Sequence, residues 1–457
     1  MKNYEPCALL IVIGFLSTFT YKLHRLLMGS KQASPVTRRQ PVAPTVNVDA
    51  IVDAVGEYSL VYIFVNPTSG GNKAAALMSQ ETNPLTFSED GLRAQIFIHN
   101  IRDGEHGNKP GFHDMRDRVN AYSGTEPVHV IVAGGDGTVM WAIQEAQAHN
   151  VALGKVAFGH IPYGTGNDFA RSLGWGGSNP SKSIMQNGMK VFKNMIKEYI
   201  GADVIDFDIW NVELKVEDAG GMIKQVKDGE KVPMMEGSTE RKVLIKPMCN
   251  YFSLGIESRI GLGFDKKRTT SAFRNKVRYV LEGFKKSMMS FTRINEMVEE
   301  CVVEENGITR TIFSNTSMSA KVPKLSGDPI SLIFLNINSF GAGCDLWRVA
   351  NKTGITPTEL SPAFTKQSVG DHKLDIMTYN RLASLTMEQS KNTVMGGNGR
   401  CVAQEKGPIV LRFRKETADK RTYLQIDGEF FALERCEKVT LSHNMVIKVL
   451  KKRAPSK

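Results

Sequence analysis

The chain has 457 residues, 41% of them hydrophobic and 23% charged, an ordinary globular composition that is long enough for two or three domains. Its six cysteines form no Cys-x-x-Cys pair, which argues against zinc modules and a disulfide framework and favours a reducing compartment. The net charge of +11 fits either a solvated basic surface or an anionic partner. Because the sequence has no aromatic-rich RNA motif or Cys/His finger, we expect that partner to be a membrane surface and not nucleic acid.

The chain begins with an apolar segment. Residues 6–21 (PCALLIVIGFLSTFTY) carry no charge, and basic residues follow from Lys22 onward. The segment has a borderline length for a membrane-spanning helix, and the positive charges after it favour a cytosolic body. We therefore expect residues 1–28 to be a membrane anchor; the alternative is a cleaved signal peptide that directs the chain into the secretory pathway. Residues 29–55, rich in Pro, Ser, Thr and Gln, are expected to form a linker.

The first strand is expected at residues 60–65 (LVYIFV), since a short apolar run is typical of a buried parallel strand. A glycine-rich turn follows it, at residues 66–73 (NPTSGGNK), and then a short helical stretch at 75–78. A further strand is expected at residues 93–98 (RAQIFI).

A second strand–turn–helix unit runs from Val128 to His149. Residues 128–133 (VHVIVA) form an apolar run, GGDGT at 134–138 allows a tight turn and a close approach to the backbone, and residues 139–149 have helical spacing. This geometry presents backbone N–H groups to a phosphate. A carboxylate at Asp136 is tolerated there if Mg²⁺ bridges it to the phosphates or if it takes the proton of an attacking hydroxyl, so the turn indicates phosphoryl transfer.

A third unit follows at residues 155–161 (KVAFGHI), with the turn PYGTGND at 162–168 and a helix from Phe169. Strands that alternate with helices predict a parallel wound sheet, in which ligands bind beyond the carboxyl ends of the strands. A single glycine-rich turn is usually only a tight connection, but three on one edge indicate a phosphate site. The sequence contains neither a P-loop nor protein-kinase signatures.

From about Trp210 the pattern becomes β-rich. A hairpin is expected around Asn306-Gly307, and strands at residues 330–337, 409–413, 423–426 and 439–449, whereas residues 217–241 and 315–324 are expected to be insertion loops. Residues 272–289 predict an amphipathic helix with a basic face. Either its apolar face packs on the core while the basic face is solvated, or the basic face contacts anionic lipid.

These segments together resemble eukaryotic diacylglycerol kinases over most of the chain. The matching stretches are NPTSGG (66–71), AGGDGTV (133–139), IPYGTGNDFARSLGWGG (161–177), NYFSLGIESRIGLGF (250–264), FLNINSFGAGCDLW (334–347) and LQIDGEF (424–430). GGDG alone is shared with NAD kinases and sphingosine kinases, but the 161–177 and 250–264 segments are far more specific.

The resemblance implies an ATP- and Mg²⁺-dependent lipid kinase that phosphorylates 1,2-diacylglycerol to phosphatidic acid. Its fold class would be α/β: a parallel domain similar to phosphofructokinases at residues 56–209, followed by a β-sandwich-like accessory domain at residues 210–452, with the active site between them. The nucleotide would be held by Asn66, Ser69, Gly70, Gly71, Gly134, Gly135, Gly137, Thr138, Gly164, Thr165, Gly166 and Asn167.

Five acidic residues carry further expectations. The resemblance implies that Glu429 is the general base, with Asp427 beside it, and that Asp136 acts through Mg²⁺ or in a carboxylate pair. The alternative for Glu429 is a surface acid on an ordinary hairpin turn. A structural Mg²⁺ site would use Asp371 and Asp375, although His372 replaces a glycine of the family pattern there.

Three other functions remain open at this point. A sphingosine- or ceramide-type lipid kinase would share the glycine turns, a catalytically silent lipid-binding protein would not need both Asp136 and Glu429, and a soluble NAD kinase fits poorly with the apolar N-terminus.

Overall fold

The structure, a computed structural model, describes residues 58–80, 82–227, 230–259, 292–350, 352–389, 398–417 and 421–454. The apolar segment at the N-terminus and the basic helix expected at residues 272–289 lie outside these residues. Among the helices that are described, none is both long and apolar enough to cross a membrane.

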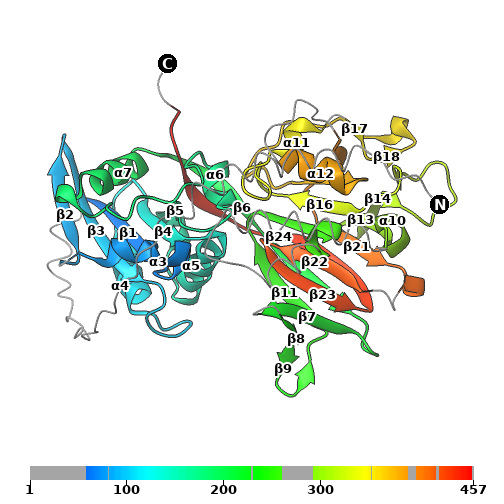
Figure 1. Ribbon diagram of the computed structural model, residues 1–457, viewed down its shortest axis with the longest axis horizontal. Coiled ribbons are helices and arrows are strands. Elements are labelled where there is room, and N and C mark those ends of the chain that lie inside the picture. The colour runs from blue at the N-terminus through cyan, green and yellow to red at the C-terminus, as the bar shows by residue number, and fades with distance from the viewer. Residues whose placement is uncertain are drawn as a thin grey trace, which may run out of the picture. The chain divides into compact units, whose positions relative to one another are not determined.

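The first half of the described chain alternates strands and helices, as expected (Figure 1). Its strands pair in the order β2-β3-β1-β4-β5, all parallel except β2 at the edge. The strands are β1 (Ser59–Val65), β2 (Leu85–Glu89), β3 (Leu92–Asn100), β4 (Val128–Gly134) and β5 (Val156–Pro162). The helical segments are α3 (Ser69–Asn72), η1 (Ala74–Met78), α4 (Pro110–Ala121), α5 (Asp136–Ala148), α6 (Asp168–Ser172) and α7 (Lys190–Ile200).

Helices cover both faces of this parallel sheet, which is why its central strands are continuous apolar runs. Along β1, Tyr62 and Phe64 pack into one core cluster, which contains residues of α4 and α5. Val61 and Ile63, which point to the opposite face, pack into a second cluster with residues of α7.

The three glycine-rich turns follow β1, β4 and β5, which are neighbours in the sheet. Parallel strands end at the same edge, so the three turns lie together there, and the prediction of a shared edge is confirmed.

The second half is rich in strands, as predicted. Its longer strands are β6 (Asp203–Val216), β7 (Met222–Lys227), β11 (Val243–Met248), β12 (Tyr251–Gly255), β13 (Val298–Glu305), β14 (Ile308–Ser314), β16 (Ser331–Leu335), β19 (Leu374–Tyr379), β20 (Arg400–Glu405), β21 (Ile409–Phe413), β22 (Thr422–Ile426), β23 (Glu429–Glu434) and β24 (Cys436–Lys451). The short elements are β8 (Glu230–Pro233), β9 (Met235–Glu236), β10 (Thr239–Glu240), β15 (Lys324–Leu325), β17 (Lys352–Thr353), β18 (Ile355–Thr356), α10 (Ile294–Met297), α11 (Leu346–Val349) and α12 (Leu382–Gln389).

One sheet runs through both halves. β24 is parallel to β5 at Lys448 and Val449, antiparallel to β6 along most of its length, and antiparallel to β21 on its other side. The expected boundary between residues 209 and 210 therefore falls inside β6. The long strands β6 and β24 tie the nucleotide edge of the first half to the β-rich second half.

Three local expectations have different outcomes. The hairpin is confirmed, because β13 and β14 are joined at Asn306 and Gly307, both with positive φ as a type I′ turn requires. The insertion loop expected at residues 217–241 is wrong, because β7 pairs with β23 and β8 pairs with β7 at a sheet edge. Edge strands tolerate polar side chains since one face is solvated, which is why the polar composition misled the prediction. Residues 315–323 have no regular structure, as expected.

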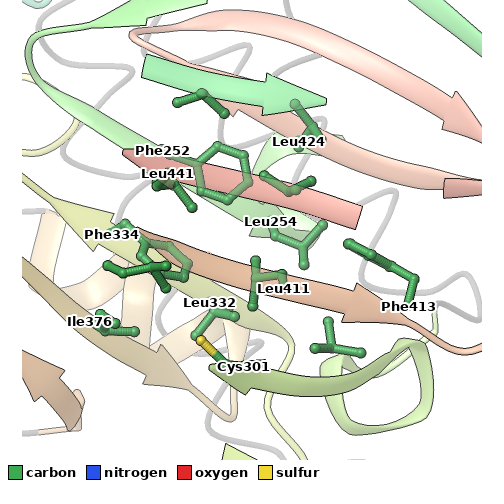
Figure 2. Packing of buried hydrophobic residues seen from close by; sticks show 14 of the residues in the cluster. Phe252, Leu254, Cys301, Leu332, Phe334, Ile376, Leu411, Phe413, Leu424 and Leu441 are labelled. Atoms are coloured by element: carbon green, nitrogen blue, oxygen red, sulfur yellow. The ribbon is translucent and has the colours of Figure 1, made fainter. Parts of the chain in front are cut away.

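The core of the second half is filled from two sheets (Figure 2). β12, β16, β19 and β22 of one sheet contribute Phe252, Leu254, Leu332, Phe334, Ile376 and Leu424. β13, β21 and β24 of the continuous sheet contribute Cys301, Leu411, Phe413 and Leu441. This core fixes the loops of the second half against the carboxyl edge of the first.

Candidate nucleotide site

A cleft of about 980 Å³ opens at the carboxyl edge of the parallel sheet. We call it the glycine cleft, because residues of all three glycine-rich turns line it. Nine of the twelve predicted nucleotide residues are among its lining: Asn66, Ser69, Gly70, Gly71, Gly135, Gly137, Thr138, Gly164 and Thr165. Its volume lies at the upper end of the range for small-molecule sites.

Two of the turns touch through their backbones. A Cβ on Gly164 would lie 2.7 Å from Gly135 Cα and 2.7 Å from Asn167 Oδ1, closer than real Cβ contacts allow. The first turn is also close, because a Cβ on Gly70, which has φ +63°, would lie 3.0 Å from the carbonyl oxygen of Tyr163. Glycine is needed at these positions for close approach as well as for conformation.

Three predicted residues support the cleft without lining it. Asn167 has left-handed φ, accepts the Gly164 N–H at 2.8 Å, and donates to the carbonyl oxygens of Gly164 and Gly177. A Cβ on Gly134 would meet the Thr138 side chain at 2.5 Å. Gly166 accepts a hydrogen bond from Arg171 Nε through its carbonyl oxygen at 2.9 Å. These residues fix the shape of the turns.

The charge of the glycine cleft comes from residues that the sequence analysis did not select. Lys73, Arg102 and Arg171 are the charged residues of its lining in the described chain, and no carboxylate is among them. Arg102 donates to Asn66 Oδ1 at 3.0 Å and to Thr68 Oγ1 at 3.1 Å, so it is fixed at the first turn. Lys73 is the last residue of the first glycine-rich turn (66–73) and Arg171 lies inside the 161–177 motif, which was the available signal. A basic, glycine-lined cleft suits a polyphosphate.

Asp136 lies behind this lining. It is the first residue of α5, and its carboxylate accepts the backbone N–H of Asp168 at 3.2 Å and of Phe169 at 2.9 Å. Those N–H groups belong to the first turn of α6 and have no partner within that helix. Asp136 therefore joins the second glycine turn to the helix that follows the third.

Asp168 continues this connection into the second half. Its buried carboxylate accepts from Ser339 Oγ at 2.5 Å, from the backbone N–H groups of Ala342 and Gly343 at 3.0 Å, and from Tyr251 Oη at 3.2 Å. Burial, with the nearby Asp136 charge, raises the pKa of Asp168. Asp168 lies inside the 161–177 motif but was not among the predicted site residues, and the carboxylate pair expected for Asp136 was with Glu429.

Asp427 and Glu429 lie in the hairpin between β22 and β23. Asp427 is half-buried and accepts the backbone N–H groups of Cys249, Asn250 and Tyr251, and its partial desolvation raises its pKa to about 6. Glu429 is exposed, forms an ion pair with Lys246 at 2.5 Å and accepts from Gln225 at 2.7 Å. Its position is that of an acid on a hairpin surface, and it is not among the residues that line the glycine cleft.

The two acids expected at a structural Mg²⁺ site lie before and within β19. Asp375 is buried, accepts from Gln404 Nε2 at 2.6 Å, and has its pKa raised by burial to about 7. Asp371 accepts the backbone N–H of Lys373 at 3.1 Å, and burial raises its pKa as well. Each carboxylate therefore already has a protein donor.

Comparison with known proteins matches both halves of the chain. The family description "Diacylglycerol kinase catalytic domain" matches residues 60–197, and "Diacylglycerol kinase accessory domain" matches residues 247–430. Diacylglycerol kinase theta of Mus musculus is 27% identical over 379 residues, which cover 80% of this chain and 32% of that protein. The eye-specific diacylglycerol kinase of Drosophila melanogaster is 26% identical, over 81% of this chain and 21% of its own length. A probable diacylglycerol kinase 3 of Caenorhabditis elegans is 22% identical, over 86% and 44% respectively. The chain spans about a third of the length of the first of these relatives.

Proposed function

The chain belongs to the diacylglycerol kinase family, and on that premise we propose that it transfers the γ-phosphoryl group of ATP to 1,2-diacylglycerol to give phosphatidic acid. The observation that carries this proposal is the glycine cleft, which combines three backbone turns with three cations at the carboxyl edge of the sheet. A polyphosphate fits this combination of N–H donors and positive charge better than an uncharged ligand does.

In this proposal the nucleotide phosphates lie in the glycine cleft. Backbone N–H groups of the turns at Gly70 and Gly135 face the phosphate oxygens, and Thr138 and Thr165 add hydroxyl donors. Lys73, Arg102 and Arg171 neutralise the charge of the chain of phosphates. Because phosphoryl transfer depends on position and charge stabilisation, this arrangement supplies most of the catalysis.

Mg²⁺ is part of the proposal. Asp136 is the residue that would hold it, since Mg²⁺ in kinases binds one or two carboxylates together with substrate phosphates. Burial and the nearby charge of Asp136 both raise the pKa of Asp168. A cation beside these two carboxylates would reduce the repulsion between them. The ion would neutralise charge on the phosphates when it is bound. Asp371 and Asp375 remain the proposed residues of a separate structural Mg²⁺ site.

Glu429 is the proposed general base. The acceptor hydroxyl oxygen forms a bond to the γ-phosphorus, the bond from that phosphorus to the β,γ-bridging oxygen breaks, ADP leaves, and the hydroxyl proton goes to the Glu429 carboxylate. Asp427 is a positioning residue in this scheme, because its three backbone hydrogen bonds hold the hairpin that carries Glu429.

The finer architecture is also a proposal. We assign residues 56–209 to a phosphofructokinase-like catalytic domain and residues 210–452 to a β-sandwich-like accessory domain. The packing of two sheets around one core supports the second assignment. Residues 1–28 are the proposed membrane anchor, with the body cytosolic and facing anionic lipid, and residues 29–55 the linker.

A panel of acceptors tests the function. The full-length protein would be mixed with ATP, Mg²⁺ and vesicles that contain diacylglycerol, sphingosine or ceramide, and in a parallel reaction with NAD. We expect phosphorylated diacylglycerol as the main product. A faster reaction with sphingosine, ceramide or NAD would replace the proposal, and nucleotide binding without transfer to any acceptor would show a silent lipid-binding protein.

A further inference from the structure

Two histidines and a buried aspartate meet at one point outside the glycine cleft. His443 Nε2 lies 2.8 Å from Asp208 Oδ1, His372 Nδ1 lies 3.1 Å from the same oxygen, and the two ring nitrogens are 3.2 Å apart. All three ligand atoms therefore form a compact triangle. The residues are far apart in sequence and are not needed for the proposed phosphoryl transfer.

The three contacts of this triangle cannot all be hydrogen bonds at the same time. A ring nitrogen of neutral imidazole has either one proton or one lone pair, so it is either a donor or an acceptor. If both nitrogens donate to Asp208 Oδ1, the contact of 3.2 Å between the two nitrogens is not a hydrogen bond. If His372 donates to His443, the single lone pair of His443 Nε2 accepts that proton. His443 Nε2 then has no proton of its own to donate to the Asp208 carboxylate, which lies 2.8 Å away. A cation bound by three lone pairs satisfies every contact.

The backbone is shaped to bring these atoms together. Asp208 on β6 and His443 on β24 belong to one antiparallel pair, and the register shifts by one residue between His443 and Met445. Such a bulge turns a side chain out of the regular alternation. His372 has φ +61°, a left-handed conformation in which glycine is the usual residue. A strained backbone such as that at His372 is typical of a functional site.

Further contacts orient the ligands. The backbone N–H of His372 donates to Asp208 Oδ2 at 2.7 Å, which leaves Oδ1 directed at the two rings. The ring of Trp210 meets that of His443 edge to face at 5.5 Å between centroids. Supporting contacts of this kind hold the ligands of protein metal sites in place.

We propose that Asp208, His372 and His443 bind a divalent transition metal ion of the zinc class. Two imidazoles and one carboxylate are a typical zinc ligand set, whereas Mg²⁺ prefers oxygen ligands only. Tetrahedral Zn²⁺ with bonds of about 2.0–2.2 Å separates its ligand atoms by about 3.3 Å. The observed separations of 2.8–3.2 Å need to open by only a few tenths of an ångström.

The fourth ligand is a water molecule in this proposal, because the His372 side chain is half exposed and Asp208 is fully buried beneath it. The ion joins β6, β24 and the turn before β19. Since β24 also pairs with β5 of the nucleotide half, the ion stabilises the pairing of β6 with β24, which runs through both halves.

Metal titration of the full-length protein tests this site. After treatment with a chelator and its removal, the protein would be titrated with Zn²⁺, and separately with Co²⁺ and Mg²⁺, and followed by calorimetry, by the visible spectrum of Co²⁺ and by the thermal midpoint. We expect one equivalent of Zn²⁺ or Co²⁺, a four-coordinate Co²⁺ spectrum and a raised midpoint. Failure of both Zn²⁺ and Co²⁺ to bind stoichiometrically would overturn the proposal.

Two variants locate the site. His372→Gly removes a ligand and suits the left-handed backbone, so the metal-free protein should be at least as stable as the wild type, while Zn²⁺ affinity should fall at least tenfold and the Co²⁺ spectrum should be lost. His443→Ala should lose the same signals. His113→Ala, which changes a half-buried histidine on α4 outside this cluster, should bind as the wild type does. Unchanged stoichiometric binding in both ligand variants would overturn the assignment.

Discussion

The carboxylate of Asp136 accepts the backbone N–H of Phe169 at 2.9 Å, and this bond joins the helices that begin after two of the three glycine turns. Asp168, next to Phe169, is bonded in turn to Ser339, Ala342 and Gly343. The glycine cleft is therefore held in shape by the carboxylates of Asp136 and Asp168, which link its turns to each other and to the second half of the chain. Those carboxylates accept protein donors and do not line the cleft.

Asp136→Ala should lower both stability and nucleotide affinity. It removes two hydrogen bonds to a charged acceptor, which together contribute roughly 3 kcal/mol. Denaturant unfolding gives the first quantity and calorimetry with ATP the second. Asp117→Ala, on the exposed face of α4 and paired with Arg116, is the matched control and should change neither. An Asp136→Ala protein with wild-type stability and wild-type ATP affinity would refute this role.

Gly164→Ala should abolish ATP binding and leave the rest of the fold unchanged. Its methyl group would overlap Gly135 Cα and Asn167 Oδ1, so the second and third turns would have to separate. Gly154→Ala is the matched control, because Gly154 has no heavy atom within 4 Å of an added Cβ and no positive φ. Calorimetry with ATP on both proteins decides the matter, and equal affinities would rule out close approach of the two turns.

Lys73→Met should weaken ATP binding about tenfold to a hundredfold, because it removes one of three cations in the glycine cleft and keeps the length of the side chain. The affinity of the variant should also depend less on salt concentration. Lys190→Met, at the exposed start of α7, serves as the control. If Lys73→Met binds ATP as tightly as the control at low salt, the cleft does not hold phosphates.

Glu257→Gln should change the pH dependence of stability. Burial raises the pKa of Glu257 from 4.5 to about 7, so the folded protein binds this proton more tightly than the unfolded chain. The ionised Glu257 carboxylate therefore destabilises the folded protein. This destabilisation is fully present above pH 7 and declines as the pH falls toward 4.5. At pH 8 the unfolding free energy of the variant should exceed that of the wild type by on the order of 3 kcal/mol, and this difference should shrink by pH 5.5. Unfolding free energies across this range provide the check; a constant difference would contradict the assignment.

The nucleotide edge was predictable because its signals are local. β1, β4 and β5 are apolar runs that end in glycine-rich turns, and neighbouring parallel strands bring such turns to one edge whatever the loops between them do. The cations Lys73 and Arg171 were also adjacent to these turns.

The connections between the halves were not predictable, since they join residues far apart in sequence. Asp168 meets Ser339 across 171 positions, and Asp208 meets His443 across 235. The long pairing of β6 with β24 brings the latter two together, and a one-residue bulge decides which way His443 points. The polar segment that contains β7 and β8 likewise forms strands only because β23 supplies hydrogen-bond partners to β7.

Transfer of radioactive phosphate tests the central claim most directly. The full-length protein would be given γ-³²P-ATP, Mg²⁺ and diacylglycerol vesicles, in parallel with Glu429→Gln, which keeps the shape of the side chain but cannot take the hydroxyl proton. We predict labelled phosphatidic acid from the wild type and a loss of at least a hundredfold in the variant, with ATP affinity unchanged. Absence of labelled lipid from the wild type would contradict the proposed kinase activity, and wild-type rates in Glu429→Gln would contradict the assignment of the base.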